Sequence, residues 1–501
     1  MTATDYFLGV DDGGTMVKAV VFDECGNEAG GASRELEMET PGPGFTERCM
    51  DYLWAETAAT IREAVGASGI DPKQIKGVAC TGHGKGLYLW GKNGRPVRNG
   101  IVSTDSRAWE YPKRWKADGT ADRVFEKTYQ TILASQPVSL LRWLKDNEPA
   151  ALRGARWIFE CKDYVRFMLT GEAYAEVTDY SGSNLLNLRD RRFDAELLAE
   201  YGLEDLLHAL PPLKNSSEAC GRVTKEAALL TGLTEGCAVA GGMFDIDACA
   251  VAMDITSEEN IAVIAGTWSI NEYISKTPVL DKSVMMNSLY AIDGYYLIEE
   301  CSPTSAGNFK WFADMFLESE KAEAARKSKN FYAHLDSLAQ STPPCGTDIF
   351  FLPHIYGSNY NPQAKAAIIG LDGSQTRPQI VRAALEGVAY CHRVHIDRLL
   401  ANRRSTKAIR LAGGAAKSGV WAKIFADATG IPIERVDADE LGTLGSAMAA
   451  AVASGKYANL AEAAKRMVKI KDRTEPDPAL TALYNMKFQK YKRFAEALDP
   501  L

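Results

Sequence analysis

The chain has 501 residues, 46% of them hydrophobic and 24% charged, which is typical of a globular protein too long for one hydrophobic core, so we expect two or more domains. The formal net charge is −8, no long basic run is present and no apolar stretch approaches the ~18 residues of a membrane span, which argues against nucleic-acid and membrane partners. The ten cysteines form no C-x-x-C pair, so we expect reduced thiols and a cytoplasmic location.

The first predicted element is a β-hairpin. Apolar strands at residues 7–10 and 17–22 flank a glycine-rich turn at residues 11–15. Its glycines permit positive φ and close approach of the backbone to a ligand. Successive N–H groups of such a turn can point at one phosphate, although an ordinary hairpin bend has the same sequence pattern. The candidate phosphate-binding residues are Asp11, Gly13, Gly14, Thr15 and Lys18.

Helices and strands alternate after the hairpin, as in α/β folds. Residues 51–66 have the apolar spacing of a helix, and residues 75–81 have the pattern of a buried strand. This strand opens into a glycine-rich loop at residues 82–86, and ligands gather at such strand ends in open α/β sheets. A further strand at residues 238–242 ends in glycines shortly before Asp245.

A second glycine-threonine turn follows an apolar run at Ala265 and leads into another strand-like stretch. It contains Gly266 and Thr267 and lies about half the chain length after the first turn. The repeat predicts two related halves that close on a nucleotide. We place the boundary in the polar stretch near residues 254–260, which gives predicted domains at residues 1–254 and 255–501.

The second half contains a predicted long helix towards residue 400, the pair Gly413-Gly414 and an alanine- and glycine-rich segment at residues 442–453 that allows close helix packing. The long helix carries His392 and His395, which we interpret as packing residues rather than metal ligands. The P-loop, serine-hydrolase, zincin and Rossmann motifs are absent. The remaining hypothesis is a site in which the hairpin turns bind a nucleotide.

Several motifs together resemble one family, the FGGY carbohydrate kinases. Residues 11–15 are similar to its phosphate motif, with Gly14 in place of the usual first threonine and Lys18 where glycerol kinase has arginine. Residues 366–371 and 379–386 fit its second signature at every position, whereas its first signature is only partly met because Leu140 stands where a lysine is usual. The resemblance implies an α/β fold of two related domains of the actin/hexokinase-like ATPase (ribonuclease H-like) type, with a central cleft.

The resemblance also implies roles for individual residues, with ATP and Mg²⁺ as cofactors. Asp245 would be the general base and also contact the sugar, and Asp11 would help to bind Mg²⁺. Gly266 and Thr267 would hold the phosphates from the second half. The segment that binds the nucleotide would include Gly413, Gly414 and Lys417. The candidate sugar-binding residues are His83, Gly84, Lys85, Asp105 and Asp245. Asp105 is equally compatible with a structural role.

Residues 84–87 and 302–305 are closest to the L-xylulose kinases within this family. The implied function is transfer of the γ-phosphate of ATP to a terminal hydroxyl of a pentulose, with L-xylulose as the first candidate. D-xylulose, ribulose and a keto-sugar acid are alternatives, and Lys85 could bind the carboxylate of such an acid. A nucleotide-dependent sugar sensor without catalysis is an alternative of another class. A homodimer is compatible with the sequence, because dimers are common among soluble enzymes.

Overall fold

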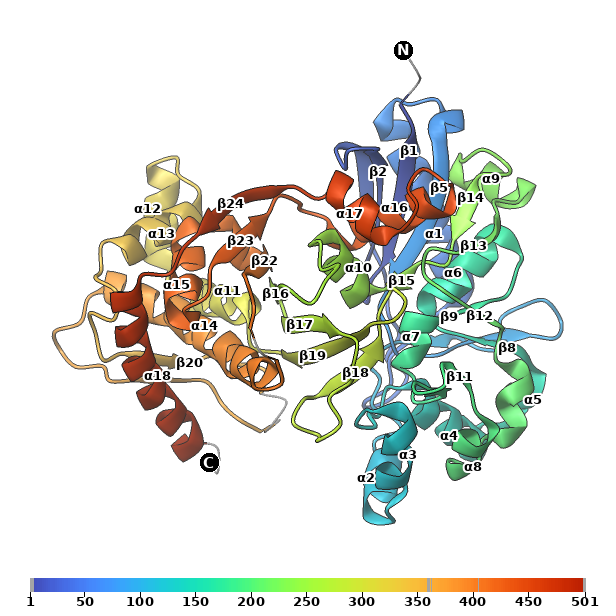
Figure 1. Ribbon diagram of the computed structural model, residues 1–501, viewed down its shortest axis with the longest axis horizontal. Coiled ribbons are helices and arrows are strands. Elements are labelled where there is room, and N and C mark those ends of the chain that lie inside the picture. The colour runs from blue at the N-terminus through green and yellow to red at the C-terminus, as the bar shows by residue number, and fades with distance from the viewer. Residues whose placement is uncertain (1–3, 358–360, 362, 404, 499–501) are drawn as a thin grey trace.

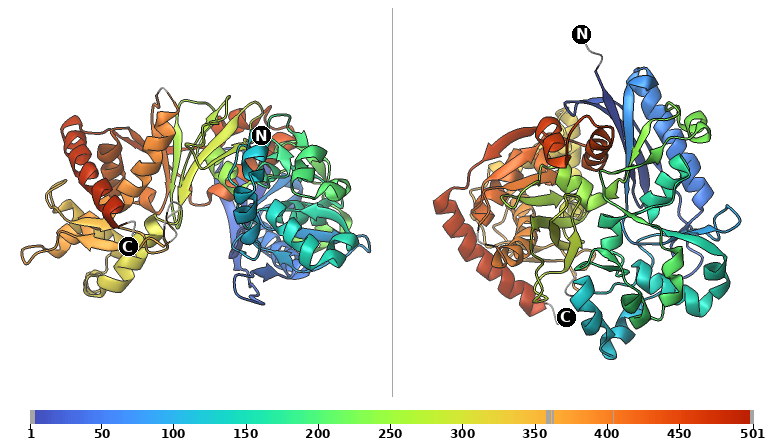
Figure 2. Two further views of the ribbon diagram at one scale, coloured as in Figure 1. Left: turned by 90° about the horizontal axis from the view of Figure 1, so that it is seen from below. Right: turned by 45° about the vertical axis from the view of Figure 1, so that its right-hand side comes forward.

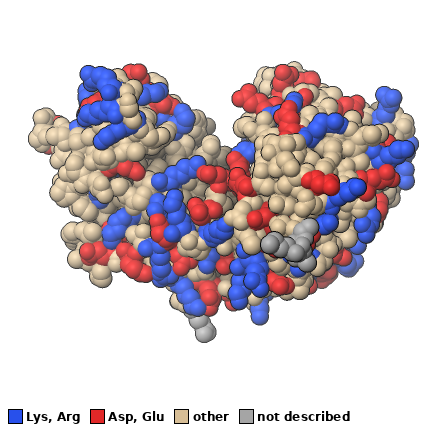
Figure 3. Space-filling model, turned by 90° about the horizontal axis from the view of Figure 1, so that it is seen from above, with Lys and Arg blue, Asp and Glu red and all other residues tan. Residues whose placement is uncertain are grey.

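The computed structural model describes residues 4–357, 361, 363–403 and 405–498, which form two lobes (Figure 1). Each lobe is built on a seven-stranded mixed sheet. The first half of the chain, blue to green in Figure 1, forms one lobe, and most of the second half forms the other. A deep hollow lies between the lobes in the space-filling view of Figure 3, which agrees with the predicted central cleft.

The predicted first hairpin lies inside the sheet of the first lobe. Strands β1 and β2 pair antiparallel with Asp11 opposite Lys18, and β5 lies parallel to β1 on its other side. The short strand β15 continues beside the end of β5. The sheet has the order β13-β14-β5-β1-β2-β3. Its strands are β1 (Tyr6–Asp12), β2 (Met16–Asp23), β3 (Glu28–Glu35), β5 (Ile75–Gly82), β13 (Ala219–Arg222), β14 (Ala238–Ala240) and β15 (Met243–Phe244).

The second predicted hairpin lies inside the sheet of the second lobe in the same way. Strands β16 and β17 pair antiparallel around the turn that contains Gly266 and Thr267, and β22 lies parallel to β16. The sheet has the order β18-β19-β17-β16-β22-β23-β24. Its strands are β16 (Ile261–Ala265), β17 (Ser269–Ser275), β18 (Met286–Leu289), β19 (Tyr296–Ser302), β22 (Ile409–Gly413), β23 (Ile433–Val436) and β24 (Ile470–Thr474).

The two sheets share one pairing pattern. In each, a hairpin is followed by a third antiparallel strand, β3 or β19. On the other side of the hairpin, two parallel strands follow, β5 and β14 in the first lobe and β22 and β23 in the second. An antiparallel strand then closes that edge, β13 or β24. The shared pattern confirms the prediction of two related halves with the actin/hexokinase-like fold.

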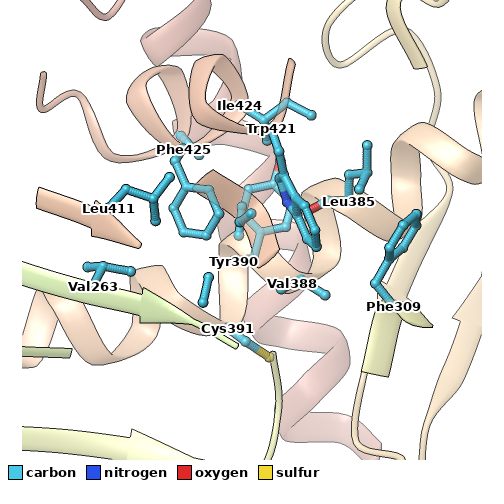
Figure 4. Close-up of a cluster of buried hydrophobic side chains, with 14 of the residues drawn as sticks. Val263, Phe309, Leu385, Val388, Tyr390, Cys391, Leu411, Trp421, Ile424 and Phe425 are labelled. Carbon is cyan, nitrogen blue, oxygen red and sulfur yellow. The ribbon is translucent and has the colours of Figure 1, made fainter. Parts of the chain in front are cut away.

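Helices cover the outer faces of both sheets. In the first lobe the apolar face of α1 packs on the sheet, together with α6 and α9. In the second lobe α11, α14, α15 and α18 enclose a core of aromatic and aliphatic side chains, part of which is drawn in Figure 4. The helices are α1 (Met50–Ser68), α6 (Cys161–Thr170), α9 (Lys225–Thr231), α11 (Ala306–Phe316), α14 (Arg377–Ala401), α15 (Gly419–Thr429) and α18 (Pro478–Leu498).

Smaller elements complete each lobe. A separate hydrophobic cluster joins several short helices below the first sheet in Figure 1, namely α2 (Glu110–Ala117), α3 (Thr120–Thr128), α4 (Pro137–Asn147), α5 (Pro149–Gly154), α7 (Val177–Ser181) and α8 (Ala195–Glu200). The second lobe adds α12 (Glu318–Arg326) and α13 (Phe331–Gln340). The two-stranded ladders are β4–β7 (Glu47–Arg48, Gly100–Ile101), β6–β8 (Tyr88–Gly91, Ala155–Phe159), β9–β12 (Ala175–Glu176, Leu213–Lys214), β10–β11 (Leu186–Asn187, Arg192–Phe193) and β20–β21 (Phe350–Leu352, Ala367–Ile369).

Two helices rich in small residues cross between the sheets, α10 (Asp245–Ala252) and α16 (Leu441–Ala453), with α17 (Leu460–Met467) beside them (Figures 1 and 2). Although α16 comes from the second half of the sequence, it packs on β1 and β5 of the first lobe. A Cβ atom on Gly9 would lie 1.8 Å from the Thr443 carbonyl oxygen, and one on Gly445 would lie 2.1 Å from that of Ala248. Close packing of the alanine- and glycine-rich segment is therefore confirmed.

The ten cysteines are all free thiols, which agrees with the prediction from their spacing. Across the described residues, no helix combines the length and the apolar character needed to span a membrane.

We predict that Gly9→Ala destabilises the protein, because its methyl group would overlap the α16 backbone. Overpacking of this kind costs about 1–3 kcal/mol. Thermal or urea unfolding measures the change. Gly66→Ala is the matched control, since a Cβ on Gly66 in α1 would meet nothing within 4 Å and Ala favours a helix. Equal stability of the Gly9→Ala variant and the wild type would contradict the close contact.

Candidate active site

The position of Asp245 is fixed by hydrogen bonds to the residues just before it. The Thr81 hydroxyl donates to the Met243 carbonyl oxygen at 2.7 Å. The Phe244 N–H donates to the Thr178 hydroxyl at 2.9 Å. Asp245 follows as the first residue of α10 and is only partly buried. The segment is thus held by β5 and α7, with the carboxylate at the start of a helix.

Several charges act on the Asp245 carboxylate. Burial raises its pKa well above the usual range, and the neighbouring carboxylates Asp11 and Asp179 raise the pKa further. Lys85 and the Ile246 N–H, which donates to Oδ1 at 2.8 Å, oppose this rise. Because such effects weaken with distance, these groups surround one site at the end of β5.

Asp11 is on β1, beside the first turn. Burial raises the pKa of Asp11 to about 6, with Lys18 lowering and Glu440 raising it. The Lys18 ammonium forms an ion pair with Glu440 at 2.7 Å, and each side chain is about one-third exposed. Lys18, a candidate phosphate-binding residue, therefore has a carboxylate partner in the structure.

The glycines of the first turn differ from the expectation in one respect. Among the described residues with positive φ, neither Gly13 nor Gly14 is present, so the turn does not use left-handed backbone. A Cβ on Gly14 would meet nothing within 4 Å, which means that this glycine leaves open space beside the turn. Arg48 donates to the Gly14 carbonyl oxygen, and Thr15 is exposed.

The second turn is also accessible, since Thr267 is exposed and Gly266 is partly so. The Gly307 N–H donates to the Gly266 carbonyl oxygen at 3.0 Å, so α11 begins beside the turn. Gly413 has φ +80°, and a Cβ there would lie 2.7 Å from the Ala265 carbonyl oxygen. Here a glycine is required both by the backbone conformation and by the close approach of β16.

Two acidic residues just before α16 form ion pairs with two lysines that are predicted to bind the nucleotide. Glu440 pairs with Lys18 of the first hairpin, and its neighbour Asp439 pairs with Lys417 at 2.7 Å. Gly414 is exposed just after the end of β22, and Lys417 lies in the short helical turn that begins there. The sequence does not predict the contacts of Asp439 and Glu440, because no local pattern indicates which cations they reach.

The glycine-rich loop after β5 packs on the residue that precedes Asp245. A Cβ on Gly84 would lie 2.2 Å from the Phe244 ring, and the Lys85 ammonium lies 5.8 Å from the centre of that ring. Lys85 has φ +66°, an uncommon conformation for a residue with a side chain. Its N–H donates to Glu160 at 2.9 Å, which holds the strained loop in place.

Two predicted sugar-binding side chains are buried inside the first lobe. His83 is 5% exposed and its Nε2 lies 2.9 Å from the Tyr88 hydroxyl, while burial and Arg48 lower the pKa of His83 to about 4. Asp105 accepts hydrogen bonds from the Thr46 N–H and the Arg107 guanidinium, and its side chain is fully buried. Of the two interpretations left open for Asp105, these contacts favour the structural one.

The predicted packing role of the two histidines agrees with the structure. His392 is buried and its Nε2 lies 2.9 Å from the Ser305 hydroxyl, at the start of α11. His395 has a carboxylate partner that sequence analysis missed, because its Nδ1 lies 3.0 Å from Glu300. The contact joins α14 to β19.

A buried cluster of charged side chains includes Asp179, whose charge acts on Asp245. The Lys162 ammonium lies 2.9 Å from Asp163, 3.2 Å from Glu176 and 3.2 Å from Asp179. Arg166 pairs with Asp163 at 2.7 Å. All five side chains are at most 1% exposed. The sequence does not predict this cluster, because Lys162 of α6 meets Glu176 of β9 and Asp179 of α7 only through tertiary packing.

The repeated sheets, the accessible turn in each lobe and the carboxylate between them define a two-lobed ATPase fold of the actin and hexokinase type. Residues 6–252 match the N-terminal domain of the FGGY family of carbohydrate kinases, and residues 261–454 match its C-terminal domain. The chain belongs to this family and is a phosphotransferase with an alcohol group as acceptor. The predicted division after residue 254 lies between the matched ranges and stays a prediction.

Known proteins resemble the chain over nearly its whole length. It is 35% identical over 498 residues to the L-xylulose/3-keto-L-gulonate kinase of Escherichia coli (strain K12), covering 99% of this chain and 98% of that protein. It is 33% identical to a probable L-xylulose kinase of Pasteurella multocida, covering 99% and 100%. The crystal structure of xylulose kinase from Rhodospirillum rubrum matches with a TM-score of 0.88 and 26% identity over 99% of each chain. Sugar kinases of this family use ATP, generally with Mg²⁺.

We predict that Lys162→Met strongly destabilises the protein, because three buried carboxylates would lose their shared cation. Removing one partner of a buried ion pair costs about 3–5 kcal/mol. Lys490→Met is the control, since that lysine pairs with Asp348 and both side chains are largely exposed, where such pairs contribute about 1 kcal/mol or less. Equal losses in urea unfolding would contradict the importance of the buried cluster.

Proposed function

We propose that the protein transfers the γ-phosphate of ATP to a terminal hydroxyl of a pentulose, with L-xylulose as the first candidate. The observation that carries the proposal is the position of Asp245, at the end of a strand and the start of α10, with Asp11 and Lys85 acting on its charge. The names of the relatives support the choice of sugar. A cytoplasmic location and a homodimer are further parts of the proposal.

The nucleotide would bind between the two turns. Backbone N–H groups at Gly13, Gly14, Gly266 and Thr267 would donate to phosphate oxygens, and Thr15, Lys18 and Lys417 would add side-chain donors. Lys18 would exchange its Glu440 partner for a phosphate. Gly413 and Gly414 would let the chain pass close to the adenosine.

Asp11 fits a role in Mg²⁺ binding. Mg²⁺ prefers oxygen ligands, and the Asp11 carboxylate is partly exposed next to the first turn, where its charge is balanced by Lys18. A bound Mg²⁺ would supply positive charge that offsets the negative charge of the phosphates during transfer. Asp11 would hold the ion directly or through water.

Asp245 would accept the proton of the attacking sugar hydroxyl. Its raised pKa makes the carboxylate a stronger base than an exposed aspartate. Lys85 and the Ile246 N–H at the helix N-terminus oppose this rise of the pKa and so favour the ionised form. Closure of the lobes would exclude water, which competes with the sugar for the phosphate.

Lys85 is the residue that bears on the choice of sugar. Its ammonium could donate to hydroxyls of a pentulose, or it could pair with the carboxylate of a keto-sugar acid. The second candidate substrate class is favoured by the name of the Escherichia coli relative, which includes 3-keto-L-gulonate. D-xylulose and ribulose remain alternatives. His83, Gly84 and Asp105 would shape the pocket from inside the first lobe.

The experiment that tests the proposal is ADP release by purified protein with ATP, Mg²⁺ and a panel of L-xylulose, D-xylulose, ribulose and 3-keto-L-gulonate. The expected result is the highest kcat/KM with L-xylulose. A preference for the sugar acid that disappears in Lys85→Met would favour the second candidate. Nucleotide binding without sugar-stimulated ADP release would favour the non-catalytic sensor.

We predict that Asp245→Asn lowers kcat by about 10²- to 10⁴-fold while ATP still binds, because a general base contributes about this much. Steady-state kinetics and equilibrium ATP binding measure the two effects. Asp247→Asn is the matched control, because its buried carboxylate accepts the Ala291 N–H at 3.0 Å and serves the fold. Near-normal turnover of Asp245→Asn would refute the assigned role.

We predict that Lys85→Gln moves the acidic limb of the kcat/KM profile to higher pH. Lys85 lowers the pKa of Asp245, so its removal raises that pKa, and the base then loses its charge at a higher pH. Lys85→Arg keeps the positive charge and should leave the limb near its wild-type position. An unchanged limb in both variants would exclude electrostatic contact between positions 85 and 245.

A further inference from the structure

A second cluster of polar side chains lies in the other lobe, away from the proposed active site. Glu320 and Glu323 are three residues apart on α12, and His334 faces them from α13. One ligand atom from each of the three residues lies within 4.8 Å of the others. Glu320 and His334 are only 5% and 6% exposed, whereas Glu323 is partly buried.

The histidine of this cluster has a ring nitrogen without a partner. His334 Nε2 is buried and forms no hydrogen bond within the described part of the chain. The nearest carboxylate atom that it faces is Glu320 Oε2, at 3.9 Å, which is too far for a hydrogen bond. Buried polar atoms are nearly always satisfied, so an unpaired nitrogen aimed at two carboxylates indicates a missing ligand.

Neighbouring cations leave one oxygen of each carboxylate available. Arg377, at the start of α14, donates to Glu320 Oε1 at 2.9 Å. Lys327 donates to Glu323 Oε1 at 2.5 Å. These contacts orient the side chains, and the other oxygen of each glutamate can face the histidine. Both cations are largely exposed, so they are held weakly and can move when a metal ion binds.

We propose that Glu320, Glu323 and His334 form a binding site for a divalent transition-metal ion of the Zn²⁺ class. One imidazole nitrogen and two carboxylates suit Zn²⁺, with water as a fourth ligand, whereas Mg²⁺ prefers oxygen ligands alone. Metal bonds of about 2.0–2.2 Å require the three atoms to move closer together, which the partly exposed Glu323 allows. The ion would join α12 to α13 next to the start of α14. It would stabilise the second lobe and take no part in phosphoryl transfer.

The experiment uses full-length protein freed of metal with a chelator, which is then removed. Calorimetric titration with ZnCl₂ should give a site that is lost, or weakened at least about tenfold, in His334→Asn and in Glu323→Gln. Zinc should also raise Tm of the wild type more than that of either variant, since a ligand that binds only the folded state stabilises it. Glu323→Gln serves if His334→Asn fails to fold.

Two controls keep the result specific. Glu318→Gln changes an exposed carboxylate on the same helix, and His208→Asn changes an exposed histidine of the first lobe, so both should bind zinc like the wild type. Zinc bound by the free thiols is common to all variants and cancels in the comparison. Equal zinc affinity of Glu323→Gln, His334→Asn and the wild type would overturn the proposal. An equal rise of Tm with the same concentration of MgCl₂ would overturn the assignment to a transition metal.

Discussion

The close contact between α10 and α16 is the constraint on which the arrangement of the site depends. The two helices meet where Gly445 approaches the Ala248 backbone, and α16 also lies against Gly9 of β1. Asp245 is the first residue of α10, and Glu440 directly precedes α16. The crossing therefore brings the N-termini of both helices to the first hairpin. A bulkier side chain at the crossing would shift both ends together, because the contact is between backbones.

The second constraint is electrostatic. Burial raises the pKa of Asp11, Asp245 and Asp179, and the charges of Asp11 and Asp179 raise the pKa of Asp245 further. Three lysines from different elements compensate for this accumulation of acids: Lys18, Lys85 and Lys162. Lys162 is fully buried and serves the fold, whereas Lys18 and Lys85 remain partly exposed and can interact with ligands. The compensating cations thus differ in accessibility, from buried Lys162 to the partly exposed Lys18 and Lys85.

The two lobes are similar in fold but contribute different residues to the candidate active site. Asp245 and the glycine-rich loop at residues 82–86 belong to the first lobe. The second lobe contributes the turn at Gly266 and the segment after β22. Membership of the FGGY family establishes the reaction class, because the family models cover both lobes. Relatives with the same fold carry the names of different substrates, so the fold alone does not determine the sugar.

The sequence by itself determined the two hairpins, their repetition, the strand ending at Gly82 and the small-residue helix α16, because each of these leaves a local pattern of apolar spacing and glycine. Only the tertiary structure decided that Glu440 meets Lys18, that Lys162 meets three acids and that His334 faces two glutamates. It also decided that neither Gly13 nor Gly14 has positive φ and that Gly14 leaves open space beside the turn. Contacts between distant elements depend on how helices and sheets pack, and no local pattern records that packing.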